Sequence, residues 1–201
     1  MGGMVAQSVH RGVLAFVERN ADHAYQVMRD ETAIDDCDIR IDAMAASLIA
    51  LEQPVASDMR LVVAAIKIST DLERMGDLAV NIAARGLSLM GQPELHHPIV
   101  LTDIAGLVES MVLRSLDAFV RRDAQLAYDV LAANNGVDAM RAGIQRQVVK
   151  MMEQEPASIE RALDHLVAAR SLERIGDHAQ NIAEGVIYLV QGIDIRHQPA
   201  A

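Results

Sequence analysis

The sequence predicts an all-α protein built as two tandem three-helix bundles that arose by internal duplication. Apolar residues make up 51% of the 201-residue chain, whereas aromatic residues are only 2% and Trp is absent. Small and aliphatic side chains must therefore fill the core, and this composition, with sparse Gly and Pro, favours helices. The hexapeptide LERMGD at 72–77 recurs as LERIGD at 172–177. A repeat with a period near half the chain indicates duplication.

The repeat extends beyond the hexapeptide. Residues 71–83 match residues 171–183 at nine of thirteen positions, with a constant offset of 100 residues. The matches include Asn81 with Asn181 and the Ile-Ala pair that follows each of them. Both halves are therefore expected to share one plan, with the repeated motif on the third helix of each.

The first half shows three segments in which apolar residues are spaced by three and four, as in amphipathic helices. Asn20 can cap the second helix, and Ser57 or Asp58 can cap the third. Pro54 ends the second helix because proline cannot continue a helix interior. Gly91 is a suitable C-terminal stop for the third. The expected helices cover residues 4–19, 22–52 and roughly 57–91.

The second half repeats this plan. Asp123 is expected to cap its second helix, and Pro156 and Ser158 to open its third, which should end near Gly192. The segment GQPELHHP at 91–98 contains two prolines and one glycine and has no apolar periodicity, so it predicts a linker. The expected domains are a first bundle at 1–91, a linker at 92–101, a second bundle at 102–192 and a loose tail at 193–201.

Charge and composition exclude several functional classes. The net charge is −10, which argues against a nucleic-acid-binding protein because such a protein needs a basic surface. Cys37 is the only cysteine, so an internal disulfide and a cysteine-based metal site are excluded. No apolar run reaches the roughly 20 residues of a membrane-spanning helix, and the N-terminus lacks the pattern of a signal peptide. The expected location is the cytoplasm.

The repeated motif places polar side chains on one helix stripe. At about 100° per residue, Glu73, Asp77 and Asn81 lie on roughly the opposite side from the apolar residues of the same helix. A solvated polar face is one interpretation of this pattern. However, Glu73 and Asp77 are like charges at i,i+4, which costs a helix a few tenths of a kcal/mol. The same oxygen-rich stripe occurs in both halves. The favoured interpretation is therefore that these side-chain oxygens bind a hard metal cation.

Glycine inside the motif predicts a close helix contact. Gly76 and Gly176 fall within expected helices, where each costs about 1 kcal/mol relative to alanine. Their occurrence in both copies predicts that a neighbouring element approaches the helix closely at this turn. His178 follows Asp177 directly and should point away from it, so an ordinary polar contact is expected for it.

These residues resemble the PhoU family. The resemblance rests on the two LERxGD copies, on QPVASDMR at 53–60 and on NIAEGVIY at 181–188, and it covers nearly the whole chain. It implies tandem three-helix bundles whose E(D)xxxD motifs bind multinuclear metal clusters, commonly of iron. It also implies a repressor of the phosphate-starvation response that links the phosphate ABC transporter to a sensor histidine kinase. Members usually carry more residues before the segment Met-Gly-Gly-Met, so a shortened first helix is expected.

The family's motif falls on Glu73 and Asp77 and on Glu173 and Asp177, with Asn81 and Asn181 as additional ligands. A neighbouring helix should supply further carboxylates, and Asp38 with Asp42 are the candidates in the first half. Their equivalents are Asp138 and Ala142, while Asp35 corresponds to Asn135, so the second half has fewer acidic groups. The expected metal ligands are Glu73, Asp77, Glu173, Asp177, Asn81, Asn181, Asp38, Asp42 and Asp138.

The expected function is a metal-binding helical adaptor and not an enzyme. Its expected cofactors are divalent or trivalent metal ions, with an iron cluster first and zinc, manganese, nickel or magnesium as alternatives. Its expected partners are the transporter's ATPase subunit, the sensor histidine kinase and a second copy of the chain. It should reach the membrane only through these partners. A carboxylate-bridged metal-dependent enzyme and a purely structural helical interaction protein remain as alternatives.

Overall fold

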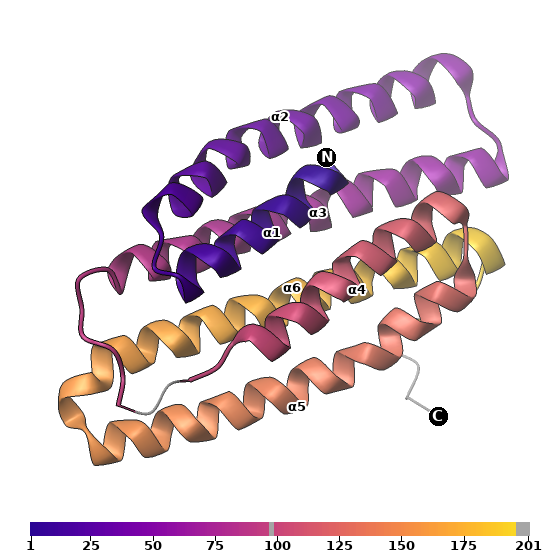
Figure 1. Ribbon diagram of the computed structural model, residues 1–201. Helices are drawn as coiled ribbons and strands as arrows, with labels where there is room; N and C mark the ends of the chain where they lie inside the picture. Colours follow the sequence, from indigo (N-terminus) through magenta and orange to yellow (C-terminus); the bar gives the residue numbers. More distant parts are fainter. Residues whose placement is uncertain (97–98, 196–201) are drawn as a thin grey trace.

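The computed structural model describes residues 1–96 and 99–195, and within them all regular secondary structure is helical (Figure 1). Each half contributes one shorter helix followed by two long ones. A short 3₁₀ turn, η1 (Pro156–Ser158), precedes the last helix. The helices are α1 (Gly2–Val17), α2 (Ala21–Glu52), α3 (Ala56–Ser88), α4 (Thr102–Arg121), α5 (Ala124–Gln154) and α6 (Ile159–Gln191).

The helix boundaries confirm most of the expectations from sequence. The side chain of Asn20 accepts hydrogen bonds from the backbone N–H groups of Asp22 and His23, and that of Asp123 accepts one from Leu126. Gly192 follows α6 with a φ of 72°. Such a positive φ suits glycine, which has no Cβ to clash.

Two boundary expectations for the third helix are wrong. Neither Ser57 nor Asp58 caps α3, because the N-cap position is Val55 and no side chain caps the helix there. The helix also ends at Ser88, before Gly91. The backbone N–H of Leu89 bonds to the carbonyls of Arg85 and Gly86 and closes the last turn. Gly91, with a φ of 72°, then turns the chain away.

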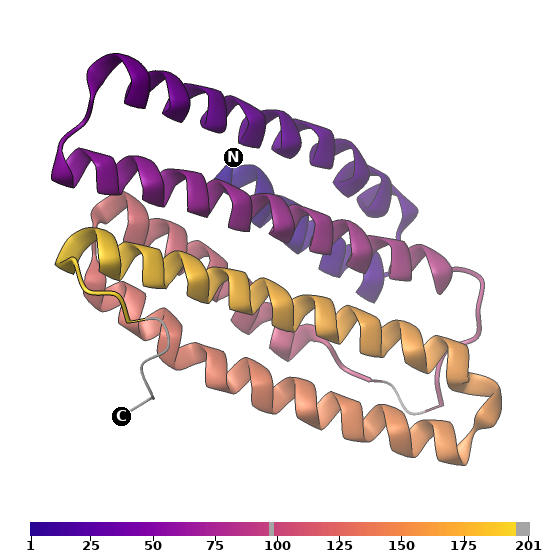
Figure 2. The ribbon, with the colours of Figure 1, turned by 180° about the vertical axis from the view of Figure 1, so that it is seen from behind.

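The two halves pack against each other along their third helices. α3 and α6 lie side by side (Figure 2). They are antiparallel, because Asp71 meets His178 and Arg85 meets Asp164. α1 also contacts α4 on the other side of this pair. The chain therefore forms one body in which the two bundles are joined along their length.

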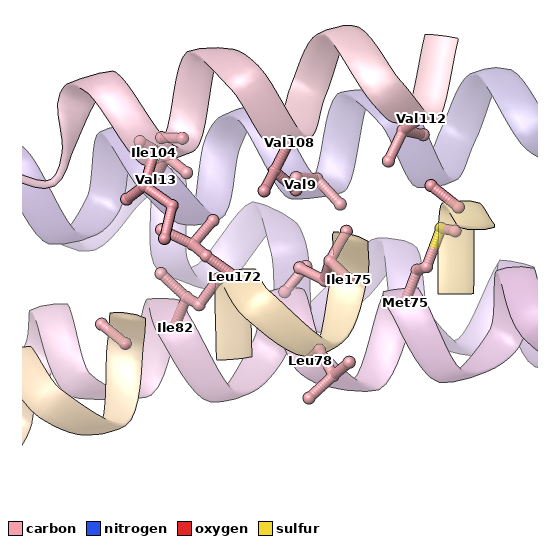
Figure 3. Close-up of a cluster of buried hydrophobic side chains, with 14 of the residues drawn as sticks. Val9, Val13, Met75, Leu78, Ile82, Ile104, Val108, Val112, Leu172 and Ile175 are labelled. Atoms are coloured by element: carbon pink, nitrogen blue, oxygen red, sulfur yellow. The ribbon is translucent and has the colours of Figure 1, made fainter. Parts of the chain in front are cut away.

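The joined bundles share one hydrophobic core (Figure 3). Val9 of α1, Met75 of α3, Val108 of α4 and Ile175 of α6 are all fully buried in it. A small residue lets α1 and α3 approach closely near the C-terminal ends of both helices. A Cβ added to Gly86 would lie 2.5 Å from the carbonyl oxygen of Ala15, so only glycine permits this crossing of α1 and α3.

The expected tail is only partly visible in the structure. Residues 193–195 follow α6 without regular structure, and 196–201 lie outside the described residues. Across the described residues, none of the helices combines the length and the hydropathy that crossing a bilayer requires.

Candidate metal centre

The motif residues of the first half lie on the side of α3 that borders α2. Ile34 of α2 packs against this turn, and a Cβ added to Gly76 would approach the Ile34 side chain to 3.3 Å. The close contact expected at this glycine is therefore confirmed. Glu73 is half-buried, whereas Asp77 and Asn81 are exposed. The polar stripe is thus partly covered at Glu73 and open to solvent at Asp77 and Asn81.

Carboxylates of α2 lie close enough to act electrostatically on the motif. The pKa of Glu73 is raised by burial first and then by the charges of Asp77, Asp35 and Asp38. Although Asp77 is exposed, partial desolvation by its surroundings and then the charge of Asp35 raise its pKa. Glu31 also has a raised pKa, because of burial and the charges of Asp35 and Asp77. We call these five residues, Glu31, Asp35, Asp38, Glu73 and Asp77, the acidic cluster.

The acidic cluster carries uncompensated negative charge. Among the described residues, no ion pair involves any of its five carboxylates. Arg74 lowers the pKa of Glu73 by its charge, but as the last and smallest of the effects on that group. Ser69 of α3 donates a hydrogen bond of 2.7 Å to Asp38, which orients that carboxylate.

Sequence reasoning found only part of this cluster. Asp38 joins it as expected, but Asp42 is exposed and is not among the charges that raise the pKa of Glu73 or Asp77. Glu31 and Asp35 were not among the expected ligands. Their spacing was a usable signal, because acidic residues at 31, 35, 38 and 42 follow one face of a helix.

The donor set of the acidic cluster suits a hard cation. Its ligands would be carboxylate oxygens alone, the type that calcium, magnesium, manganese and iron accept. The side chains are not already gathered around one point: no three His, Cys, Asp or Glu groups of the described chain are arranged to hold an ion. A bound cation would have to draw them inward by side-chain rotation.

The second half contains the same motif in different surroundings. Arg141 of α5 forms an ion pair of 2.9 Å with Glu173, and both side chains are half-buried. Asn134 donates a hydrogen bond of 3.4 Å to Asp177. Asp138 is exposed, and its charge acts on Asp177. The protein itself therefore supplies a cation and an amide to the two motif carboxylates.

Asp177 is exposed, yet partial desolvation is the largest effect on its pKa. Its pKa is raised chiefly by this desolvation and less by Glu173 and Asp138, while the hydrogen bond from Asn134 and the charge of His178 lower it. Asn134 also explains why a glycine occurs at this turn. A Cβ added to Gly176 would lie only 3.2 Å from the side-chain oxygen of Asn134.

Two residues beside the second motif take part in the contact between the halves. His178 is buried and forms a 2.8 Å hydrogen bond with Asp71 of α3, which confirms the polar contact expected for it. Asn181, one of the expected ligands, donates a hydrogen bond of 3.1 Å to the same carboxylate. Both side chains therefore face α3 and not the α5 side.

Comparison with known proteins agrees with this architecture. The PhoU domain matches the chain twice, at residues 1–86 and 101–186. The phosphate-specific transport system accessory protein PhoU homolog of Pseudomonas putida is 41% identical over 198 residues, covering 98% of this chain and 77% of that protein. The Escherichia coli accessory protein PhoU is 36% identical over 199 residues, covering 98% and 82%.

Solved structures show the same arrangement. The crystal structure of PhoU from Pseudomonas aeruginosa superposes with a TM-score of 0.93 at 39% identity, covering 96% of this chain and 92% of that one. The regulatory protein PhoU from Streptococcus pneumoniae gives a TM-score of 0.89 at 27% identity, with coverages of 96% and 91%. The chain, with its two matched domains and this fold, belongs to the PhoU family.

Proposed function

We propose that this chain is an accessory protein of a phosphate transport system and regulates phosphate uptake. The observation that carries the proposal is the match along 98% of the chain to proteins named as accessories of that system. One solved relative is described as a phosphate transport system regulatory protein. Such names support a role in binding other proteins and passing on a regulatory signal, rather than a role in catalysis.

The finer part of the proposal concerns partners. The chain represses the phosphate-starvation response by contacting the ATPase subunit of the phosphate ABC transporter and a sensor histidine kinase. It acts at the cytoplasmic face of the membrane as a homodimer. Support for these points comes from the family resemblance carried by the repeated LERxGD motif.

The metal proposal rests on the acidic cluster. A metal cation, with iron first and zinc, manganese, nickel or magnesium as alternatives, would be held by Glu73 and Asp77 together with Glu31, Asp35 and Asp38. Five carboxylates without an ion pair in the described chain are costly to keep together, and a cation offsets that cost. The bound ion would supply fixed positive charge that ties α2 to α3.

A complementation experiment tests the regulatory role and the metal site. Deletion of the gene should switch on phosphate-starvation genes in phosphate-rich medium, measured with a reporter. The intact chain should restore repression. The double variant Glu73→Ala/Asp77→Ala should restore it poorly and should carry no metal when purified without chelator.

The matched control is the same pair of substitutions in the other half, Glu173→Ala/Asp177→Ala, which should retain the metal. Normal repression in the deletion strain would refute the regulatory role. A metal content unchanged by Glu73→Ala/Asp77→Ala would refute the ligand assignment and leave the regulatory role standing.

A further inference from the structure

An open groove of about 400 Å³ lies where the N-terminal turn of α1 meets α2, α3 and the C-terminal end of α4. In Figure 1, α2 and α3 run on past the N-terminus of α1, and the groove opens beside the part of them that α1 does not cover. Among the described residues that line the groove, none is charged, and Ser69 carries the only hydroxyl group. An occupant of the groove is therefore expected to be apolar.

The internal duplication provides a second copy of this place. The tripeptide Ala-Phe-Val occurs at 15–17, in the last turn of α1, and again at 118–120, in the last turn of α4. Phe119 lines the open groove. Phe16 lines a smaller hollow, of about 320 Å³, at the opposite ends of α1 and α4. We call these two places the open copy and the covered copy, and they can be compared residue by residue.

In the covered copy, the chain itself supplies an apolar cover. Leu95, Ile99 and Leu101 of the linker line the same hollow as Phe16, and all three are buried. The side chain of Phe16 is only 5% exposed as a result. A short polypeptide segment with three apolar side chains is thus the kind of group that packs at this position of the fold.

Two arginines hold the backbone of this cover. Arg19 donates hydrogen bonds to the carbonyl oxygens of Leu89, at 3.3 Å, and of Gln92, at 2.6 Å. Arg161 of α6 donates one of 2.9 Å to the carbonyl oxygen of Pro93. Backbone hydrogen bonds combined with apolar side chains in a groove are the usual means by which a protein binds a peptide.

The open copy keeps one of these arginines in an unused state. Arg122 follows its Ala-Phe-Val tripeptide by two positions, as Arg19 does, and the two have the same left-handed backbone, with φ of 54° and 50°. The side chain of Arg122 is exposed and makes no ion pair within the described chain. Its guanidinium group can therefore donate to the backbone of a docked segment. The other arginine, Arg161, is replaced by Leu61.

The open copy also has more room beside its phenylalanine. In the covered copy, the ring of His165 packs edge-on against Phe16, with 4.9 Å between the ring centroids. Ala65 stands at the equivalent position of α3 and lines the open groove with Phe119. The smaller side chain leaves space for an apolar group that enters from outside.

We infer that the open copy binds a short apolar segment of a partner protein, held in the way that the linker is held in the covered copy. Its apolar side chains lie between Ala65 and Phe119, and Arg122 donates to its backbone carbonyls. The linker indicates the spacing, with apolar residues four and two positions apart. A second copy of this chain is a poorer occupant, because its own linker is already bonded to Arg19 and Arg161.

The test uses a fluorescein-labelled peptide with the sequence of residues 89–102 and measures fluorescence anisotropy on the full chain. Chelator is present throughout, because Ser69 of the groove is also bonded to Asp38 of the acidic cluster. Wild-type protein should bind one equivalent of the peptide. Val120→Glu, which puts a charge at the rim of the groove, should weaken binding about tenfold, and Arg122→Ala should weaken it about fivefold.

Val17→Glu is the matched control, since it makes the same change in the other Ala-Phe-Val tripeptide, where the linker is already bound. Its affinity for the peptide should stay within twofold of wild type. A peptide in which serine replaces the three apolar residues at 95, 99 and 101 should show no saturable binding. Val120 is 78% exposed, so Val120→Glu should fold normally.

Equal binding by wild type and Val120→Glu, or by the apolar peptide and the serine peptide, would overturn the inference. A loss of affinity in Val17→Glu as large as that in Val120→Glu would also overturn it, because the peptide would then bind at the covered copy. Sedimentation of the same samples should show that the peptide leaves the oligomeric state unchanged. A dimer that dissociates as the peptide binds would make a second copy the occupant. The assay needs neither metal nor phosphate, so its outcome is separate from that of the proposed function.

Discussion

The two halves carry the same Glu-x-x-x-Asp motif on equivalent helices, yet the helices that face the motif differ in charge. In the first half, α2 brings three more carboxylates to Glu73 and Asp77. In the second, α5 brings an arginine to Glu173 and an amide to Asp177. The motif alone therefore does not fix the electrostatics around its carboxylates, because the facing helix decides whether they meet further carboxylates or an arginine.

Three pairs of equivalent positions on α2 and α5 explain the difference in charge around the motif. Glu31 and Asp35 correspond to Leu131 and Asn135, and Ile41 corresponds to Arg141. Each change removes a negative charge from the second half or adds a positive one. The duplicated halves have thus diverged at the helix that faces the motif while keeping the motif itself.

The largest expected effect comes from converting one half into the other. The triple variant Leu131→Glu/Asn135→Asp/Arg141→Ile should give the second half a metal site and double the metal bound per chain. The physical reason is that it removes the competing guanidinium and restores two carboxylates. Elemental analysis of protein purified without chelator measures the ratio, and Arg141→Ile alone serves as the intermediate. A ratio unchanged in the triple variant would show that other features distinguish the halves.

A smaller effect is expected on the stability of the metal-free protein. Glu173→Gln breaks the half-buried ion pair with Arg141 and should lower the free energy of unfolding by roughly 1 kcal/mol. Glu73→Gln removes one of several repelling charges and should raise it by a few tenths of a kcal/mol. Denaturant unfolding in the presence of chelator measures both. Shifts of the same sign for the two variants would contradict the proposed difference between the halves.

The smallest effect is a pH dependence confined to the acidic cluster. Burial and neighbouring charges raise the pKa of Glu73 and of Asp77 in the folded state. The native state therefore binds more protons than the unfolded state, and this contribution to stability is lost as pH rises through the raised pKa. Metal-free wild type and Glu73→Gln/Asp77→Asn should be equally stable below about pH 4, and the variant should gain as pH rises.

The matched control for this prediction is Glu173→Gln. The stability change caused by Glu173→Gln should not follow the trend of Glu73→Gln/Asp77→Asn, because Glu173 pairs with Arg141 and lies outside the acidic cluster. A gap between wild type and Glu73→Gln/Asp77→Asn that is independent of pH would show that the charges of the acidic cluster do not repel one another measurably.

Helix periodicity and duplication were sufficient to predict the fold. The six helices, the caps at Asn20 and Asp123 and the contact at Gly76 all follow from local spacing. The crossing of α1 and α3 at Gly86 did not follow, because Gly86 has no glycine equivalent in the second half, where Val186 stands.

The sequence predicts which site residues share one helix, but not which residues of a neighbouring helix face them. Glu73 and Asp77 are marked by the repeat, but their partners depend on how α2 is rotated against α3. That rotation selects Glu31 and Asp35 over Asp42 as the nearer charges. The contact of Arg141 with Glu173 was not predicted for the same reason. The equivalent position in the first half holds an ordinary apolar residue, Ile41.

The core shared by α1, α3, α4 and α6 has a thermodynamic consequence (Figure 3). Since α3 and α6 bury their apolar faces in one cluster, neither bundle can melt without exposing the surface of the other, and unfolding should be a single cooperative transition. A ligand that binds only the native first half then protects the second half as well, by mass action. One occupied site would therefore stabilise all six helices against unfolding.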